Sequence, residues 1–220
     1  MNKKILLGML VLILAFGFMV ASCSDDGGVP SAVKNLPSFD GRAVNSQAEA
    51  EQLGDESMGV IMMAIDDAIS NSPSIIRDPL QSEESRNVIF DDNFNHNGVR
   101  GHERLTVTGS NPITANYSLL ATLDGTYTGY RIVGRIESTA NFTVSGSEHN
   151  PNISGRMNYT ATYTVSANGV GMKLHATVNA NITSSNYGTM TMRATAYDND
   201  NNVLYTFNMS QSGRIEDWDF

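Results

Sequence analysis

Apolar and polar residues alternate along most of the chain between residues 113 and 209. The most regular stretch runs from Val170 to Ile182, where every second residue is apolar and the residues between are mostly polar. A period of two is typical of a β-strand that buries one face. Asp124-Gly125 and Asn168-Gly169 favour two-residue hairpin turns between such stretches. The pattern therefore predicts seven or eight antiparallel strands in a meander, with one apolar face and one face rich in Thr, Asn and Ser.

A helical period precedes the strands. Ser46 and Glu49 match a capping box, and Asn71 and Pro73 end the pattern. Between them, apolar residues recur at the spacing of one helix face, at Leu53, Val60, Ile61, Ala64, Ile65, Ala68 and Ile69. We therefore expect a helix near residues 47–70 that covers the apolar face of the sheet. The predicted fold class is mainly β, with an N-terminal helix packed on a curved antiparallel meander sheet or a partly open β-barrel.

A transmembrane barrel would show a similar alternation, with lipid on its apolar side. Phe220 and Trp218 resemble the terminal aromatic residues of outer-membrane barrels. However, Arg214 and Glu216 break the parity that this signal would continue, and the apolar positions are rich in alanine. We therefore favour a sheet with one water-facing side and one buried side.

The N-terminus has the pattern of a secretory leader. Lys3 and Lys4 precede an uncharged apolar run from Ile5 to Val20, which is shorter than the ~20 residues of a membrane span. Val20-Ala21-Ser22-Cys23 then resembles a bacterial lipobox, and Cys23 is the only cysteine of the chain. An ordinary leader with a free thiol and an uncleaved anchor are the alternatives.

The resemblance to bacterial lipoproteins implies that residues 1–22 are a signal peptide, cleaved between Ser22 and Cys23. It also implies that the Cys23 sulfur carries a diacylglyceryl group and that the new amine receives an acyl chain such as palmitate. Two or more chains anchor a protein stably, at about 0.8 kcal/mol for each buried CH₂. The resemblance also bears on the membrane, because Ser24 rather than Asp follows the cysteine. This favours the outer membrane over the inner one and leaves the periplasmic and surface faces both open.

The rest of the chain divides into a linker and one domain. Residues 23–45 contain Gly, Pro and Asp without a period, which predicts a flexible tether behind the lipidated N-terminus. Residues 46–220 are predicted to form a single helix-plus-meander domain. Without the leader's two lysines, the chain has 14 − 2 = 12 basic and 23 acidic residues, a formal charge of 12 − 23 = −11. This excess of acid argues against nucleic acid as a partner and against docking on anionic headgroups.

The side chains that most often carry chemistry lack the expected spacing. None of His96, His102, His149 and His175 has a partner at metal-ligand spacing. The stretch from Asp198 to Asn202 resembles the opening of a calcium loop, but Val203 and Met209 occupy the positions of its Gly and Glu, so a hairpin turn is the better interpretation. No nucleophile, phosphate-loop or dinucleotide motif occurs. We therefore expect no catalytic residue, no metal and no cofactor, and we do not expect an enzyme.

The sequence thus favours a membrane-anchored, non-catalytic module of the cell envelope that binds or assembles with an envelope protein or an apolar ligand. A surface-exposed structural or adhesin-like lipoprotein is the alternative. A third hypothesis rests on the helix-first order and half-open barrel, which are similar to the carriers that move lipids or lipoproteins across the periplasm. A carrier would have an apolar pocket, with Met62, Ile65, Leu174 and Val178 as its candidate lining residues.

Overall fold

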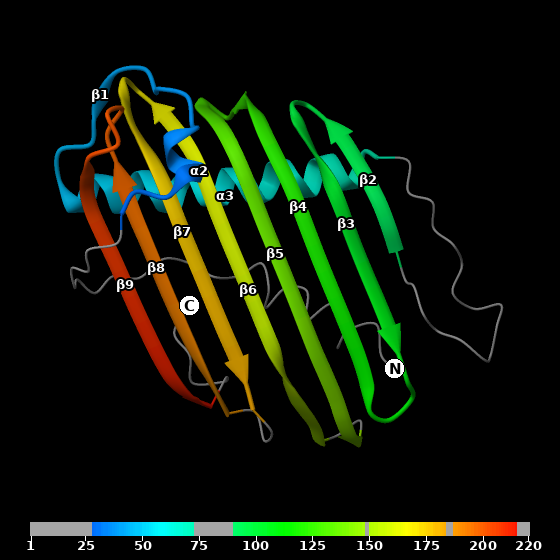
Figure 1. Cartoon of the computed structure of the whole chain (residues 1–220). Helices are drawn as coiled ribbons and strands as arrows, with labels where there is room; N and C mark the ends of the chain where they lie inside the picture. The colour runs from blue at the N-terminus through cyan, green and yellow to red at the C-terminus, as the bar shows by residue number, and fades with distance from the viewer. Residues whose placement is uncertain (1–27, 73–89, 148–149, 184–186, 215–220) are drawn as a thin grey trace.

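A computed structural model describes residues 28–72, 90–147, 150–183 and 187–214 of the chain. Eight strands pair in chain order as an antiparallel meander that does not close on itself (Figure 1). They are β2 (Phe90–His96), β3 (Val99–Thr108), β4 (Ile113–Tyr127), β5 (Tyr130–Ser147), β6 (Asn150–Ala167), β7 (Val170–Ile182), β8 (Tyr187–Tyr197) and β9 (Val203–Arg214). A short strand, β1 (Arg42–Ala43), pairs in parallel with the start of β7. The predicted fold class is confirmed as a mainly β meander sheet with an N-terminal helix.

Tight hairpins set the register of the long strands. Asn168-Gly169 joins β6 to β7 with both residues at positive φ, 53° and 77°, as a type I′ turn requires. The predicted turn at Asp124-Gly125 is wrong, because β4 continues to Tyr127 and pairs with β5 throughout. Thr128-Gly129 makes that turn instead, with φ values of 46° and 90°. A threonine at positive φ is uncommon, so the sequence carried little signal for this turn.

The predicted helix is confirmed as α3 (Gln47–Ser70), which runs across the strands on one side of the sheet (Figure 1). We call the face of the sheet toward α3 the inner face and the opposite face the outer face. The helix begins where the Ser46 Oγ accepts a hydrogen bond from the Glu49 N–H, at 3.2 Å. It ends at Asn71, whose backbone N–H donates to the Asp67 carbonyl. Across the described ranges, no helix has the length and apolar composition of a membrane span.

Residues 28–45 lie over the outer face, and we call them the strap. They include the short helix α2 (Ser31–Lys34), whose Val33 is fully buried against β6 and β7. The Thr164 Oγ1 of β6 donates to the Pro37 carbonyl at 2.8 Å. The Phe39 N–H donates to the Asn199 side chain at 2.9 Å. The sequence predicts a flexible tether over 23–45, yet the strap is folded on the sheet, because its apolar side chains meet partners far away in the sequence.

Several sequence-based predictions lie outside the described residues. These are the leader from Ile5 to Val20, the lipobox with Cys23, and the terminal Trp218 and Phe220. They stay predictions.

Candidate functional site

The helix covers only part of the inner face. Strand register places Leu174, Tyr163, Gly134 and Leu123 in one row across β7, β6, β5 and β4. The fully buried Ser57 of α3 meets this row, with its Oγ 2.9 Å from the Tyr163 hydroxyl. The next row consists mainly of small side chains, with Ala176, Ala161, Ile136 and Ala121 in register. Small side chains leave room for close packing of a helix, so α3 lies along these two rows.

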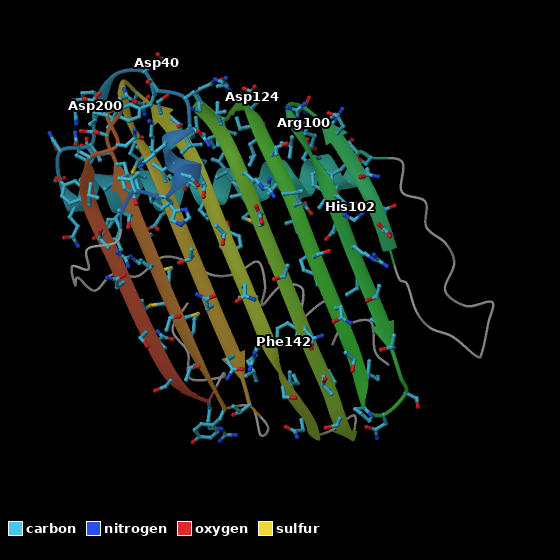
Figure 2. The ribbon with its side chains drawn as sticks, viewed as in Figure 1. Asp40, Arg100, His102, Asp124, Phe142 and Asp200 are labelled. Atoms are coloured by element: carbon cyan, nitrogen blue, oxygen red, sulfur yellow. The ribbon has the colours of Figure 1, made fainter. Side chains whose placement is uncertain are left out.

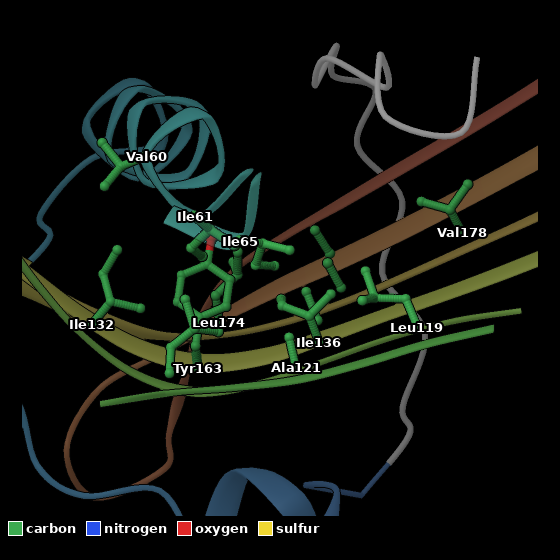
Figure 3. Packing of buried hydrophobic residues seen from close by; sticks show 14 of the residues in the cluster. Val60, Ile61, Ile65, Leu119, Ala121, Ile132, Ile136, Tyr163, Leu174 and Val178 are labelled. Carbon is green, nitrogen blue, oxygen red and sulfur yellow. The ribbon is translucent and has the colours of Figure 1, made fainter. Parts of the chain in front are cut away.

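Three further rows of the inner face continue from the edge of α3, and we call them the distal inner face. In the first of them, the Tyr159 hydroxyl donates to the Met58 sulfur of α3 at 3.1 Å. Across β7 to β3 the rows are Val178, Tyr159, Ser138, Leu119 and Glu103; then Ala180, Met157, Ala140, Tyr117 and Leu105; then Ile182, Gly155, Phe142, Ala115 and Val107. In Figure 3, Leu119 and Val178 stand on strands beyond the helix, whereas Ile61 and Ile65 lie close to Leu174. The two strand residues are 5% and 4% exposed, although no helix or strand in the described ranges lies over them.

The distal inner face is large for a surface of this kind. Strands lie ~4.8 Å apart and same-face residues ~6.7 Å apart along a strand, so three rows on β3 to β7 cover roughly 500 Å². Apolar patches of roughly 300–600 Å² are the largest that typical monomers expose, and they often mark interaction sites. The apolar area is therefore the size of a binding site, although most of its side chains are buried rather than exposed.

Two polar groups lie within this apolar area. The Tyr117 hydroxyl donates to the Glu103 Oε1 at 2.9 Å, and both side chains are buried. Burial raises the pKa of Glu103, and the nearby Asp92 and Asp66 raise it further, against the opposing effect of the Tyr117 hydrogen bond. Burial is also the main cause of the raised pKa of Tyr117. A carboxyl group held in this way favours its neutral form.

A buried hydroxyl lies in the same row as Glu103. Ser138 is 2% exposed, and its Oγ has no hydrogen-bond partner among the described residues. A largely apolar surface with a few polar groups is the usual composition of a site for a small apolar ligand.

The four predicted pocket residues do not meet at one point. Ile65 and Leu174 lie between the helix and the sheet, in the packed core. Val178 lies four residues further along β7, roughly 13 Å from Leu174, on the distal inner face. Met62 is half-buried on α3. Only Val178 among them belongs to the candidate site, and an apolar pocket lined by all four stays a prediction.

The sequence missed Glu103 and Tyr117 as a pair. The alternation that begins at residue 113 places Tyr117 on the apolar side of a strand, but no comparable pattern predicts a strand over residues 99–108. The available signal was the parity of β3, where Val99, Leu105 and Val107 share one face with Glu103. A charged residue at such a position indicates a buried carboxyl group.

The other candidate ligand groups lie apart. The His102 Nε2 lies 2.5 Å from the Asp91 carboxylate, and the His175 Nδ1 lies 2.8 Å from the Thr162 hydroxyl. The Asp198 carboxylate accepts from the Asn202 N–H at 2.8 Å, which confirms the predicted hairpin turn between β8 and β9. In the described part of the chain, no three His, Cys, Asp or Glu side chains are grouped as metal ligands would be.

Comparison of the chain with protein-family models, curated proteins and solved structures found no match. The candidate site is therefore interpreted from this chain alone.

Proposed function

We propose that this protein is a lipid-anchored, non-catalytic binding module of the cell envelope, and that the distal inner face holds an apolar partner. The observation that carries the proposal is the extent of this face, which continues from the Tyr159 contact with Met58 of α3 to rows that no described helix or strand covers. The outer membrane is the favoured site of anchoring, because Ser24 follows Cys23 in the lipobox-like motif.

A long-chain acyl group fits the chemistry of this face. Each CH₂ group that leaves water on such a surface gains about 0.8 kcal/mol. Met157 adds a flexible, polarizable side chain, and Met192 and Met190 continue two of the rows onto β8. Such side chains adapt to partners of irregular shape. The Glu103 carboxyl group, whose pKa is raised by burial, and the Ser138 hydroxyl supply hydrogen-bonding groups for the polar end of the ligand.

The anchor is tested first. Cells that express the full chain are fed an alkyne-tagged fatty acid, and the wild type is compared with Cys23→Ser. We expect the tag on the wild type in the membrane fraction, and neither the tag nor firm membrane attachment on the variant. A wild type without the tag, or a variant that stays in the membrane, would overturn the proposed anchor.

The binding face is tested by titration with a fluorescent long-chain fatty acid. The protein is the full chain with Cys23→Ser, purified without detergent. Val178→Thr keeps the shape of the side chain but places a hydroxyl on the distal inner face, and we expect about tenfold weaker binding. The matched control is Thr177→Val, the reverse exchange at the neighbouring residue, whose side chain lies on the outer face.

The control protein should bind as the parent does, and circular dichroism should show that both variants are folded. A folded parent that does not bind the probe, or equal effects of the two substitutions, would refute an apolar ligand at this face.

A further inference from the structure

The two sides of the sheet differ strongly in charge. Within the described ranges, Arg42 of the strap faces α3, and every other Lys and Arg belongs to the outer face or to the rest of the strap. These residues are Lys34, Arg100, Arg104, Arg131, Arg135, Arg156, Lys173, Arg193 and Arg214. Arg42 pairs instead with Glu49 of α3.

The opposite side is acidic. Glu49, Glu51, Asp55, Glu56, Asp66 and Asp67 lie on α3, and Asp92 and Glu103 lie on the inner face of β2 and β3. The outer side also has acids, but fewer than its basic residues: Asp91, Asp124 and Glu137 on the strands, Asp40 in the strap, and Asp198 and Asp200 in the β8–β9 hairpin. The formal charge of the whole chain averages over two sides of opposite character.

Part of the basic charge on the outer face is not neutralised locally. Arg131 pairs with Asp124 at 2.7 Å, Arg104 with Asp91 at 3.5 Å and Arg135 with Glu137, so these three charges are compensated. Lys173 is buried and donates to Asn199 and Asn201. Arg100 and Arg156 are exposed and donate to neutral side chains, those of Thr122 and Asn181. Figure 2 views the outer face, with Arg100 and His102 labelled on β3.

The strap fixes where the chain leaves the domain. Beyond the Val33 and Phe39 contacts, the Arg42 N–H donates to the Gly169 carbonyl at 3.0 Å and the Val44 N–H to the Gly171 carbonyl at 3.2 Å. Four residues separate Gly28, the first described residue, from Cys23. Even fully extended, the five steps between these two residues span at most ~18 Å. An acylated Cys23 therefore holds Gly28, the start of the strap on the outer side, within that distance of its acyl anchor.

We propose that the outer face docks on an anionic phospholipid surface beside the lipid anchor, and that α3 and the distal inner face point away from that bilayer. Both the end of the strap and the excess of Lys and Arg point to this face. The proposal rests on the lipid anchor of the proposed function. It departs from the expectation drawn from net charge, which treats the charges as evenly spread. Basic residues near an anionic surface attract it individually, whatever the charge of the far side.

The orientation is measured on the full, lipid-anchored protein in vesicles of equal parts phosphatidylglycerol and phosphatidylcholine. A dye is attached to a new cysteine at Asn158→Cys on the outer face or at Met63→Cys on α3, and energy transfer to a lipid-bound dye reports its distance from the bilayer. Asn158 is exposed, and Met63 is 61% exposed. An acylated Cys23 has no free thiol, so only the new cysteine reacts.

We expect strong transfer from residue 158 and weak transfer from residue 63, with the difference lost in pure phosphatidylcholine or at high salt. Arg100→Gln with Arg156→Gln should also remove the difference. The control, Ala48→Glu with Met63→Glu, lowers the net charge by the same two units on the helix side. With the dye at residue 158, it should keep the strong transfer of the parent.

The possible failures are distinct. Labelling of Cys23 itself, or protein that does not float with vesicles, would overturn the anchor on which the proposal rests. Anchored protein with equal transfer from both dye positions would overturn the orientation alone. An orientation unaffected by the arginine substitutions would overturn the electrostatic docking.

Discussion

The hydrogen bond between Ser57 of α3 and Tyr163 of β6 decides where the helix crosses the sheet, and so where the distal inner face begins. Both side chains are fully buried, and their oxygens are 2.9 Å apart. The Ser57 Oγ also lies 2.9 Å from the Gly54 carbonyl and donates to it. Ser57 therefore accepts a hydrogen bond from the Tyr163 hydroxyl. Replacing Ser57 or Tyr163 alone leaves a different hydroxyl group without its partner.

Ser57→Ala leaves the Tyr163 hydroxyl buried without a partner, which costs about 2 kcal/mol of unfolding free energy. The higher helix propensity of alanine returns about 0.5 kcal/mol. Tyr163→Phe removes one hydrogen bond, but Ser57 still donates to the Gly54 carbonyl, so the loss is about 1 kcal/mol. In the double variant both polar groups are gone, and we expect almost no loss. The two substitutions should therefore be coupled by about 2 kcal/mol.

Urea unfolding followed by circular dichroism, on the wild type and the three variants, measures this coupling. Ser57→Ala combined with Tyr187→Phe is the control, because Tyr187 is 54% exposed and far along the sheet on β8. That pair should be additive. If the Ser57 and Tyr163 substitutions are also additive to within ~0.5 kcal/mol, α3 does not cross the sheet at Tyr163 and the position of the candidate site is wrong.

Three further predictions concern other parts of the fold. Since the pKa of Glu103 is raised, the folded protein holds the carboxyl proton more tightly than the unfolded chain, and the free energy of unfolding falls as pH rises above the ordinary pKa of 4.5. Glu103→Gln should remove this fall, so urea titrations across pH should show a more stable protein at neutral pH but not at low pH. Gly134→Ala should destabilise by about 1–3 kcal/mol in the same assay, because a Cβ there would collide with Tyr163 and the Thr162 carbonyl. Val33→Ala should cost about 1.5 kcal/mol of unfolding free energy and expose the strap to protease, since it removes two fully buried methyl groups.

The helices and strands that could be predicted are those whose hydrophobic pattern and end signals lie entirely within their own sequence. β7 alternates without interruption, and α3 has its cap and its apolar stripe in the local sequence. β3 was missed because Gly101 and Glu103 occupy two of its inner positions, so its alternation is broken. The chain tolerates the carboxyl group there only through Tyr117, a residue of the next strand, which no local pattern reveals.

The fold of the strap and the separation of charge between the two faces could not be predicted, because both depend on residues that are far apart in sequence. Phe39 packs its ring over Gly171, and its backbone bonds to the Asn199 side chain, so both contacts need the finished sheet. The outer-face arginines are scattered in sequence and gather only through strand register. A count of charges along the chain cannot separate two faces that alternate residue by residue.

The meander has a consequence for the order in which the molecule forms. Each strand from β3 to β9 pairs with the strand just made, so these contacts close short loops, which favours rapid folding. β1 is the exception, because Arg42 pairs with Val170, which lies much later in the chain. As the chain is synthesised, the strap therefore emerges early but docks late. Its release from the sheet would then be an early event in unfolding, which leaves the meander as the kinetically persistent part of the protein.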